Sequence, residues 1–575
     1  MIKYNFKTYS ELFSHLTQAY DNKFFLNYLS NGEYKNISVE DFKNKVICLS
    51  LALNDLGIKK GDTVAIFANS SPFWLIFDFA IHQVGAISVP IFANISTKNL
   101  NFEIQDSNIK YMFIDSEERV KDIEKKDLTY ITHNFCVKKD NFHNYDDILV
   151  SGQEICLLKG FEFHEPLEDE VFSIIYTSGN TGTPKGVMLT HKNIISQMYD
   201  INQIINLQEK EIALSLLPLA HIFERTVMSY YLSRGISIYF VDEITNVGNL
   251  LKVVKPTIMT AVPRLIEKIF NKIKINISAK PFIGRMIGSL AFSYAMREDM
   301  PRDTIAFKLY DKLVYSKFRE IFGNRLEKLI SGGAPLAKDI TQFFVNIGVN
   351  IYQGYGLTEF SPVISTNYPK SNKVGSCGKI LASANVRIDN NGELLAKGPS
   401  VMKGYLNQEE LTAQTIDKDG WLHTGDLAHI DGEGNLYIKS RKKEIFKTST
   451  GEYVAAVSIE QVISKNKYVE FAVVIAENKK YTTALLFVDK DKFLEEQKLN
   501  KDLTIDDYYD KDEITSDIHK HIKDVNANLN EWEKIVKYKL ITDEISIEGG
   551  ELTPSMKICR GKIEEKFEDI INTMY

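Results

Sequence analysis

Hydrophobic and polar residues follow two patterns that take turns along the first half of the chain. Stretches with apolar positions at helical spacing are followed by short apolar runs, as in the helix expected near Asp41 to Leu56 and the buried strand expected from Thr63 to Phe67. Gly57 predicts the end of that helix, because glycine readily adopts the conformation of a C-terminal cap. The rhythm continues to about Val262 and predicts an α/β fold with a largely parallel sheet.

The longest apolar stretch runs from Phe73 to Phe92. It contains Asp78 and His82 and is interrupted by Gly85 and Pro90. A membrane span needs about 20 predominantly apolar residues with few or no charges. We therefore predict a buried helix that runs into a buried strand.

Three later regions have other patterns. Between Lys272 and Gly323 the helical spacing predicts helices that pack on the core, with contact to a membrane or lipid as the alternative. From Ala384 onward, short alternating runs with the turn pairs Asn391-Gly392 and Asp431-Gly432 predict β-hairpins. The Asp-rich segment from Lys501 to Asp517 is expected to be a solvated surface excursion.

Composition narrows the class of protein. The chain has 575 residues, 44% hydrophobic and 25% charged, so several packed units are expected. Its formal net charge of -7 argues against general attraction to nucleic acid or anionic membranes, but leaves room for a local basic pocket. The five cysteines are scattered without a CxxC pair, which favours reduced thiols in the cytoplasm over a zinc site or redox couple. The amino terminus lacks the pattern of a secretory signal.

One segment joins strand character to a loop suited to phosphate. Ser173 to Tyr176 reads as a strand, and Lys185 adds a charge suited to the β- and γ-phosphates of a nucleotide. The spacing does not match the GxxxxGK[ST] loop of P-loop ATPases, and a plain turn is the commoner explanation for such a loop taken alone. The loop itself offers small, hydroxyl-bearing and permissive residues, namely Thr177, Ser178, Gly179, Asn180, Thr181, Gly182 and Thr183.

The whole string YTSGNTGTPKG resembles the YTSGTTGxPKG signature of the adenylate-forming superfamily, with Asn180 in place of the usual Thr. Further matches follow in the family's order. Ser331 to Leu336, which includes Gly333, is similar to the segment that lines the adenine pocket, and Tyr352 to Glu359 resembles the YGxTE motif. The resemblance implies an adenine-stacking Tyr355, an α-phosphate contact from Thr358 and magnesium binding by Glu359. It also places Gln353 and Gly354 in the nucleotide site.

Three more segments extend the resemblance. Trp421 to Asp426 is similar to the motif whose Asp accepts hydrogen bonds from the ribose, and Arg441 corresponds to a ribose- and phosphate-contacting Arg. Lys443 falls at the family's hinge position, and Ser440, just before Arg441, replaces a more usual Gly. In ELTPSMKICRGK, Lys557 falls on the lysine used in adenylation, although a Lys near a carboxyl terminus is otherwise a surface charge.

The branch of the superfamily is indicated by Leu216 to Arg225 and Ala261 to Lys268, which are similar to long-chain acyl-CoA synthetases. The resemblance puts His221 near the acyl carboxylate and the thioester tunnel, whereas a lone His in an apolar run is otherwise a hydrogen-bonded core residue. Some relatives gate the fatty-acid tunnel with an aromatic residue where this chain has Arg225, so a different gate is expected. Met556, where peptide-synthetase domains usually have Gly, also favours the long-chain branch.

The implied architecture has two domains. Residues 1–440 would form a large amino-terminal domain of two α/β subdomains and a β-rich subdomain, and residues 441–575 a small mobile α+β domain. The implied ligands are ATP, Mg²⁺, coenzyme A and a long-chain fatty acid, without nucleic acid. The expected location is the cytoplasm, with peripheral membrane contact as an alternative.

The implied reaction has two steps. A fatty carboxylate attacks the α-phosphorus of ATP and pyrophosphate leaves, while Lys185, Thr358, Lys557 and magnesium bound through Glu359 offset the developing charge. Rotation about Lys443 then withdraws Lys557 and brings the Gly451 region to the coenzyme A tunnel, where the thiol displaces AMP.

Two other functions stay open. The first is an enzyme that transfers the adenylate to a separate carrier protein, which a comparison of acceptors would distinguish. The second is a catalytically silent lipid-binding or interaction protein on the same fold. Retention of Lys185, Glu359, Asp426 and Lys557 argues against the silent protein, and absence of fatty-acid-dependent AMP release would support it.

Overall fold

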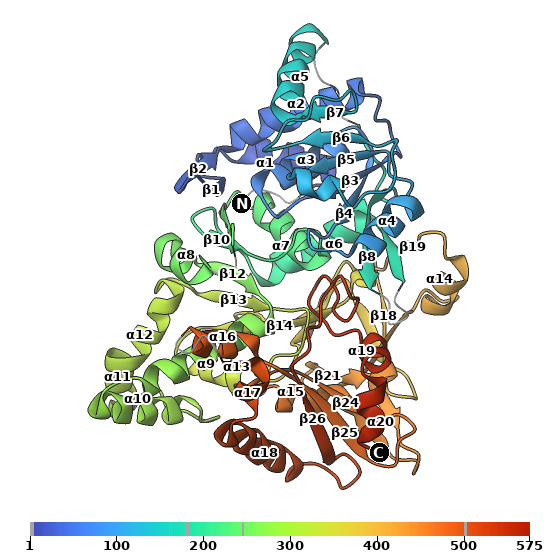
Figure 1. Cartoon of the computed structure of the whole chain (residues 1–575). Coiled ribbons are helices and arrows are strands. Elements are labelled where there is room, and N and C mark those ends of the chain that lie inside the picture. The colour runs from blue at the N-terminus through green and yellow to red at the C-terminus, as the bar shows by residue number, and fades with distance from the viewer. Residues whose placement is uncertain (1–4, 160–161, 163, 179–182, 244–245, 499–502) are drawn as a thin grey trace.

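The computed structural model describes residues 5–159, 162, 164–178, 183–243, 246–498 and 503–575. Figure 1 shows an upper part coloured from blue to green and a lower part coloured from green to red, with the carboxyl terminus at the lower right. Two large mixed sheets, a four-stranded sheet, a two-stranded hairpin and a three-stranded carboxy-terminal sheet form the framework. The predicted α/β fold class is confirmed.

The first large sheet has eight strands in the order β19-β9-β8-β4-β3-β5-β6-β7. The strands from β8 to β7 in this order run parallel, whereas β9 and β19 pair antiparallel at one end. The strands are β3 Thr63–Phe67, β4 Ile87–Ile91, β5 Tyr111–Ile114, β6 Thr129–Thr132, β7 Phe142–Asn144, β8 Val171–Ser178, β9 Pro184–Thr190 and β19 Gly404–Tyr405. The helices of this part are α1 Tyr9–Ala19, α2 Val39–Asp55, α3 Pro72–Gln83, α4 Thr97–Asp106, α5 Tyr145–Lys159 and α6 His191–Ile204.

The second large sheet has nine strands in the order β16-β15-β14-β13-β12-β10-β11-β1-β2. The strands from β14 to β1 in this order run parallel, and antiparallel strands lie at both ends. The strands are β1 Leu26–Ser30, β2 Glu33–Ile37, β10 Ile212–Ser215, β11 Ser237–Phe240, β12 Ile258–Ala261, β13 Lys328–Ser331, β14 Ile351–Gly356, β15 Val363–Thr366 and β16 Lys379–Ile380. Its connecting helices include α7 Ile222–Ser233, α8 Val247–Val254 and α13 Lys338–Asn346.

Helix α3 lies between the two large sheets. It contacts β3 and β4 of the first sheet and β1 of the second, which explains why its sequence PFWLIFDFAIHQ is apolar nearly all round. Asp78 and His82 are buried with it. The prediction of a buried helix that runs into a buried strand is confirmed by α3 and β4. Among the described residues, no helix combines the length and apolar character that crossing a bilayer requires.

The region from Lys272 to Gly323 is helical, as predicted. Phe270 and Ile273 of the first helix are buried in the core beside the nine-stranded sheet. Figure 1 places α10 and α11 at the outer, lower left edge of the molecule. The elements are α9 Pro263–Ser278, α10 Phe282–Ala295, α11 Ile305–Tyr310, a π-helix Asp311–Tyr315, α12 Ser316–Arg319 and a 3-10 helix Glu320–Phe322.

The four-stranded sheet is antiparallel, in the order β17-β18-β20-β21. Asn391-Gly392 forms the turn between β17 and β18, and Asp431-Gly432 lies between β20 and β21, so both predicted hairpins are confirmed. The elements are β17 Asn385–Ile388, β18 Glu393–Lys397, α14 Glu409–Thr415, β20 Leu422–Ile430 and β21 Leu436–Arg441.

The carboxy-terminal part combines helices with the sheet β24-β25-β26. It begins with the hairpin β22 Ile445–Lys447 and β23 Tyr453–Ala455. The sheet is formed by β24 Val469–Ile475, β25 Thr482–Val488 and β26 Ile535–Ile541. The helices are α15 Ala456–Ile463, α16 Lys490–Gln497, α17 Ile505–Tyr509, α18 Asp512–Asn526, α19 Arg560–Lys566 and α20 Glu568–Thr573.

The sequence predicts a solvated excursion from Lys501 to Asp517, and the Asp side chains of its described part are exposed, but from residue 503 onward the segment is largely helical and partly packed. Helix α17 buries Tyr508 and Tyr509 in the carboxy-terminal core. Asp506 and Asp512 lie in the first turns of α17 and α18, where the helix dipole favours negative charge. The acidic composition therefore reflects two helix N-termini and not an unpacked loop.

Candidate active site

Several predicted site residues lie at one edge of the nine-stranded sheet. Strands β10, β12, β13 and β14 run parallel and end at the same edge. The segment of His221 follows β10, the segment of Gly333 follows β13, and Gln353 and Tyr355 lie in β14 itself. Ligands of open α/β sheets bind at the carboxyl ends of the strands, so this edge is the expected place for a small-molecule site.

Tyr355, Asp426 and Arg441 form a hydrogen-bonded cluster at this edge. The Tyr355 hydroxyl donates to Asp426 Oδ2 at 2.5 Å, and Arg441 Nε lies 3.3 Å from Asp426 Oδ1. Asp426 and Arg441 are direct partners in the ladder of β20 and β21. Burial raises the pKa of Asp426, and the charge of Arg441 opposes that rise. Three predicted nucleotide-binding residues from two sheets are thus in contact.

Lys185, Glu359 and Tyr405 form a second cluster. Glu359 lies with the nearly buried Thr358 in a 3-10 helix after β14, and its Oε1 accepts a hydrogen bond of 2.7 Å from the Tyr405 hydroxyl. Lys185 Nζ lies 5.3 Å from the centroid of the Tyr405 ring. Burial lowers the pKa of Lys185, and the Glu359 carboxylate opposes this effect. A carboxylate and an ammonium group are therefore held beside one aromatic ring.

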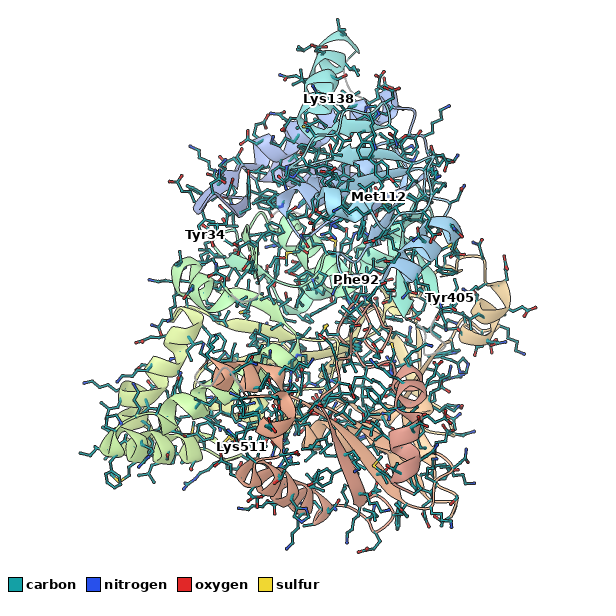
Figure 2. The ribbon with its side chains drawn as sticks, in the orientation of Figure 1. Tyr34, Phe92, Met112, Lys138, Tyr405 and Lys511 are labelled. Carbon is teal, nitrogen blue, oxygen red and sulfur yellow. The ribbon has the colours of Figure 1, made fainter. Side chains whose placement is uncertain are left out.

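Tyr405 is a residue of this site that the sequence does not single out. It lies in the short strand β19, which pairs with β9 and places Tyr405 opposite Val187. Figure 2 shows Phe92 and Tyr405 in the band where the upper and lower parts of the molecule meet. Only the pairing of two segments far apart in the sequence brings Tyr405 to Lys185, so no local pattern could have predicted it.

The predicted phosphate loop is the connection of a β-hairpin. Strands β8 and β9 pair antiparallel, with Thr177 opposite Lys185 and Ser178 opposite Pro184. The strand predicted from Ser173 is confirmed, and the register holds the backbone of Thr177 beside that of Lys185. Four of the predicted loop residues lie outside the described residues, namely Gly179, Asn180, Thr181 and Gly182.

Gln353 brings an unpaired acceptor to the site edge. Its Oε1 atom and Ser331 Oγ are buried without a hydrogen-bond partner among the described residues, and the two residues are partners in the ladder of β13 and β14. Such atoms are rare in folded proteins, so a ligand with hydrogen-bond donors would satisfy them. Gly333 has a φ of 83° and open space around it, whereas a Cβ on Gly354 would approach Ser365 O to 3.2 Å.

His221 caps the amino terminus of α7. Its Nδ1 accepts a hydrogen bond of 3.2 Å from the Phe223 N–H. Burial, with a smaller contribution from the positive charge of Lys557, lowers the pKa of His221 to about 4. The imidazole is therefore neutral at pH 7, and because Nδ1 is an acceptor, its proton lies on Nε2. His221 can offer one N–H donor to a ligand.

Lys557 reaches the site from the carboxy-terminal part. Its loop is anchored on the amino-terminal part, because Asn94 Nδ2 donates to Pro554 O at 3.1 Å and the Thr97 N–H donates to Glu548 Oε2 at 3.2 Å. Lys557 is exposed to solvent on one side. The protein around it still removes part of the water from its ammonium group, and this desolvation, followed by the positive charge of Arg441, lowers the pKa of Lys557. Its charge also acts on the pKa values of His221 and Asp426. The structure therefore places the charge of Lys557 within electrostatic range of His221 and Asp426.

Lys443 and Gly451 lie near the beginning of the carboxy-terminal part. Lys443 is exposed in the 3-10 helix Lys442–Glu444. Burial has the largest effect on the pKa of Lys185 and Glu359 the next largest, and the positive charge of Lys443 makes a smaller contribution that lowers this pKa. Gly451 lies between β22 and β23 with a φ of 96°, and an added Cβ would meet no atom within 4 Å. Gly451 is thus not packed against the other candidate residues in this arrangement.

Arg225 is not an open side chain at a tunnel mouth. It is fully buried one helical turn after His221, with Nη2 at 2.6 Å and Nε at 3.1 Å from the Asp78 carboxylate. Ser173 and Ser88 accept further hydrogen bonds from its guanidinium at 2.6 and 2.8 Å. Arg225 therefore joins α7 to α3 and the eight-stranded sheet.

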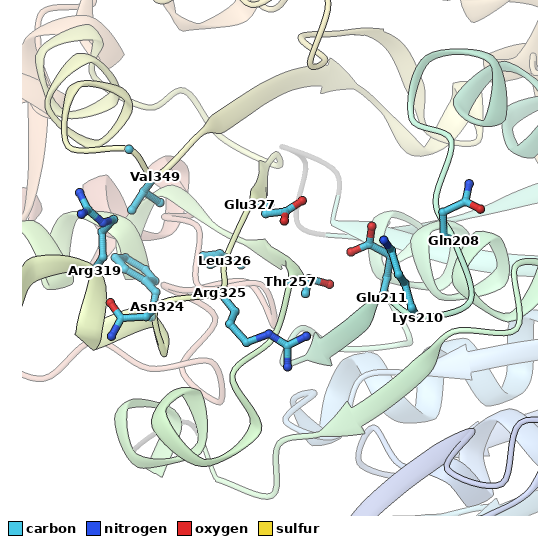
Figure 3. Close-up of a pocket in the computed structure, with 12 residues that line it drawn as sticks. Gln208, Lys210, Glu211, Thr257, Arg319, Asn324, Arg325, Leu326, Glu327 and Val349 are labelled. Atoms are coloured by element: carbon cyan, nitrogen blue, oxygen red, sulfur yellow. The ribbon is translucent and has the colours of Figure 1, made fainter. Parts of the chain in front are cut away.

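A separate hollow of about 540 Å³ lies at the opposite edge of the nine-stranded sheet (Figure 3). Its lining includes Glu211, Thr257, Glu327 and Val349, which precede β10, β12, β13 and β14. These residues are at the amino ends of the parallel strands, whereas the candidate residues are at the carboxyl ends. The hollow is therefore distinct from the candidate site.

Glu224 is a buried carboxyl group that the sequence did not identify as special. Its oxygens accept hydrogen bonds from Ser215 Oγ at 2.7 Å and from Thr260 Oγ1 at 2.6 Å. Ser215 ends β10 and Thr260 lies in β12, so Glu224 ties α7 to two strand ends beside His221. Burial raises the pKa of Glu224 to about 7.

The contribution of Glu224 to the free energy of unfolding should therefore decrease as the pH rises. The pKa of Glu224 in the folded protein is about 7, above the ordinary value of 4.5. Between pH 4.5 and 7, the native state therefore keeps a proton that the unfolded chain has released. This contribution is complete below pH 4.5 and is lost as the pH rises through 7. Relative to Glu224→Gln, wild-type stability should decline by roughly 3 kcal/mol between the two limits. Urea unfolding of both proteins at a series of pH values measures this, and parallel pH curves would contradict it.

Comparisons with known proteins identify the family of this chain. The model of the AMP-binding enzyme family matches residues 13–406, and that of the AMP-binding enzyme C-terminal domain matches residues 443–575. A long-chain-fatty-acid–CoA ligase of Mycobacterium bovis is 30% identical over 95% of this chain and 93% of its own length. The Mus musculus long-chain-fatty-acid–CoA ligase 5 is 29% identical over 99% of this chain and 88% of its own.

A solved structure shares the fold. The adenylation domain of a carboxylate reductase from Mycobacterium chelonae matches with a TM-score of 0.79 at 20% identity, covering 99% of this chain and 91% of that chain. The likeness extends over both the amino-terminal and the carboxy-terminal parts.

Proposed function

The chain belongs to the family of AMP-binding enzymes within the adenylate-forming superfamily, and on that premise we propose that it is a long-chain fatty acid–CoA ligase. The reaction would form acyl-CoA, AMP and pyrophosphate through an acyl-adenylate. The observation that supports the proposal is the Tyr355–Asp426–Arg441 cluster, together with the position of Lys557, whose charge acts on both His221 and Asp426. The full-length similarity to ligases of this name supports the choice of acid and acceptor.

The nucleoside would bind beside the Tyr355 cluster. The aromatic face of Tyr355 suits adenine, and the Asp426 carboxylate can accept hydrogen bonds from ribose hydroxyls. The unpaired Gln353 Oε1 is an acceptor that could receive a hydrogen bond from an amino group such as that of adenine. Arg441 would neutralise Asp426 and contact phosphate, while Gly333, which has open space around it, would leave room for the base.

The phosphates would lie along the β8–β9 hairpin. The backbone of Thr177 and Ser178 leads into the loop, Lys185 supplies positive charge, and Thr358 offers a hydroxyl. Glu359 fits a magnesium ion held mainly by nucleotide phosphates, because Mg²⁺ commonly takes one or two carboxylates and completes its shell with phosphate oxygens and water. Only Oε1 of Glu359 is engaged by Tyr405. When bound, the ion would neutralise phosphate charge.

In the first step, a carboxylate oxygen of the fatty acid forms a bond to the α-phosphorus, and the bond to the pyrophosphate oxygen breaks. Negative charge grows on the phosphate oxygens during this exchange. Lys557 would stabilise that charge, and the N–H of neutral His221 would orient the acyl carboxylate or its carbonyl oxygen.

In the second step, the coenzyme A sulfur attacks the acyl carbonyl carbon, the thiol proton is released and AMP leaves. We assign residues 1–440 and 441–575 to two domains that rotate about Lys443 between the steps. Gly451 lies at an uncrowded hairpin tip, so rotation could present it to the coenzyme A tunnel. Lys557 would leave the site in the same motion.

The products test the proposal. Full-length protein supplied with palmitate, ATP, magnesium and coenzyme A should release AMP and pyrophosphate and form palmitoyl-CoA, as followed by chromatography. Acids of about twelve carbons or more should be preferred, because each buried methylene contributes about 0.8 kcal/mol. ADP as product would overturn the adenylation assignment. Acetate or an aromatic acid outcompeting palmitate would overturn the chain-length assignment, and transfer to a carrier protein but not to coenzyme A would favour the carrier alternative.

A further inference from the structure

Helix α10 is apolar on two opposite faces. Ala291 and Ala295 are buried against the rest of the protein. Phe282, Met286 and Leu290 follow one another at intervals of four residues on the other side of the helix, and all three are exposed. A helix that is apolar all round is normally covered all round. The outer stripe of α10 is uncovered among the described residues.

The adjoining helical segment repeats this arrangement. Ile305, Leu309 and Leu313 also lie four residues apart and are exposed. The two segments are packed together, because the Tyr294 and Tyr310 rings lie 5.5 Å apart, and Figure 1 shows α10 and α11 at the outer edge of the molecule. We define the α10–α11 face by seven side chains whose exposure runs from 44% for Leu313 to 87% for Ile305: Phe282, Ile283, Met286, Leu290, Ile305, Leu309 and Leu313.

Positive charge surrounds this face. Residues 272–319 contain ten Lys or Arg and four Asp or Glu, a net charge of +6, whereas the whole chain carries -7. Lys280, Arg285, Lys308 and Lys312 are exposed, and the described residues provide no ion-pair partner for them. Unpaired positive charge is therefore concentrated around the exposed apolar stripes, although the chain as a whole is acidic.

We propose that the α10–α11 face docks on the surface of an anionic lipid bilayer. Apolar side chains flanked by Lys and Arg match the boundary between acyl chains and negatively charged headgroups, where amphipathic helices lie parallel to the membrane. A second copy of this chain fits less well, because its own face would bring the same positive charge into the contact. Binding requires no helix that spans the membrane, and it does not depend on the proposed catalytic activity.

Vesicle sedimentation of the full-length protein tests the proposal. The protein should bind vesicles of phosphatidylcholine with about 30% phosphatidylglycerol and lose most of that binding on pure phosphatidylcholine or at about 1 M salt. The triple variant F282Q/M286Q/L290Q should weaken binding by about tenfold or more. The double variant K308Q/K312Q should also weaken it, with a shallower dependence on salt.

A matched control is available on the far side of the molecule. Leu157 and Leu158 of α5 are 82% and 83% exposed, and L157Q/L158Q should bind anionic vesicles as the wild type does. Circular dichroism and thermal melting establish that each variant is folded. No binding by the wild type, or equal binding by the wild type and the triple variant, would overturn the proposal. A dimer in light scattering that the triple variant dissociates would assign the face to a second copy instead.

Discussion

Replacing Lys557 with alanine is expected to slow formation of the acyl-adenylate by about 10²- to 10³-fold while largely sparing thioester formation from preformed acyl-adenylate and coenzyme A. The reason is electrostatic. Lys557 is close enough to His221 and Asp426 for its charge to affect their pKa values, so it can stabilise charge that grows on the phosphate during the first step. In the proposed second arrangement it has left the site.

The two half-reactions are timed separately for each protein. One assay follows pyrophosphate release from ATP and palmitate, and the other follows palmitoyl-CoA formation from palmitoyl-adenylate. Lys562→Ala is the matched control, because Lys562 belongs to the same segment but pairs with Glu565 at 2.7 Å on the exposed surface of α19. Equal slowing of both half-reactions by Lys557→Ala would reject alternation of the carboxy-terminal part and leave the proposed overall reaction untouched.

Replacing Arg225 with methionine is expected to destabilise the protein by about 3–5 kcal/mol. The Arg225–Asp78 pair is fully buried, and burial alone would raise the pKa of Asp78, but Arg225 and then His82 outweigh it and lower that pKa. Removal of the guanidinium would leave a buried carboxylate without its main partner. The Ser88 and Ser173 hydroxyls would lose a hydrogen-bond donor as well.

Urea unfolding followed by tryptophan fluorescence measures this effect where it arises, because the Trp74 ring lies 5.6 Å from the Arg225 guanidinium carbon. The double variant Arg225→Met/Asp78→Leu should recover much of the loss, since an apolar pair can replace a buried ion pair. Lys60→Met, which breaks a 2.7 Å pair with Glu170 at the surface, should change stability by less than about 1 kcal/mol. A similar small change for Arg225→Met would show that the buried pair contributes little.

Arg225 and Lys557 differ in how well a sequence motif predicts the surroundings of a side chain. Both residues stand at positions that a family resemblance marks. The resemblance places Lys557 in the candidate site, and in the structure its charge acts on the pKa values of His221 and Asp426. At Arg225 it suggested an altered gate, and the structure instead shows a closed ion-pair network with Asp78, which lies on another helix.

The α10–α11 face shows the same limit for periodicity. Helical spacing correctly predicted helices between Lys272 and Gly323. It could not decide which apolar stripe would be covered, because α10 carries one on each side. Only packing against the core selected Ala291 and Ala295 and left Phe282 and Leu290 exposed.

The sequence by itself determined the features that depend on neighbours along the chain. These are the strand of Thr63–Phe67, the helix ended by Gly57, the two hairpin turns and the strand that includes Ser173 to Tyr176, since backbone preference and side-chain period act over a few residues. The ordered motifs also fixed the family. Tertiary structure alone decided that Tyr405 meets Glu359, that Glu224 joins two strand ends and that Asp78 neutralises Arg225. Each of these contacts joins elements whose adjacency depends on strand order and helix packing, and a buried polar group acquires its pKa and its role only from the partners that this arrangement supplies.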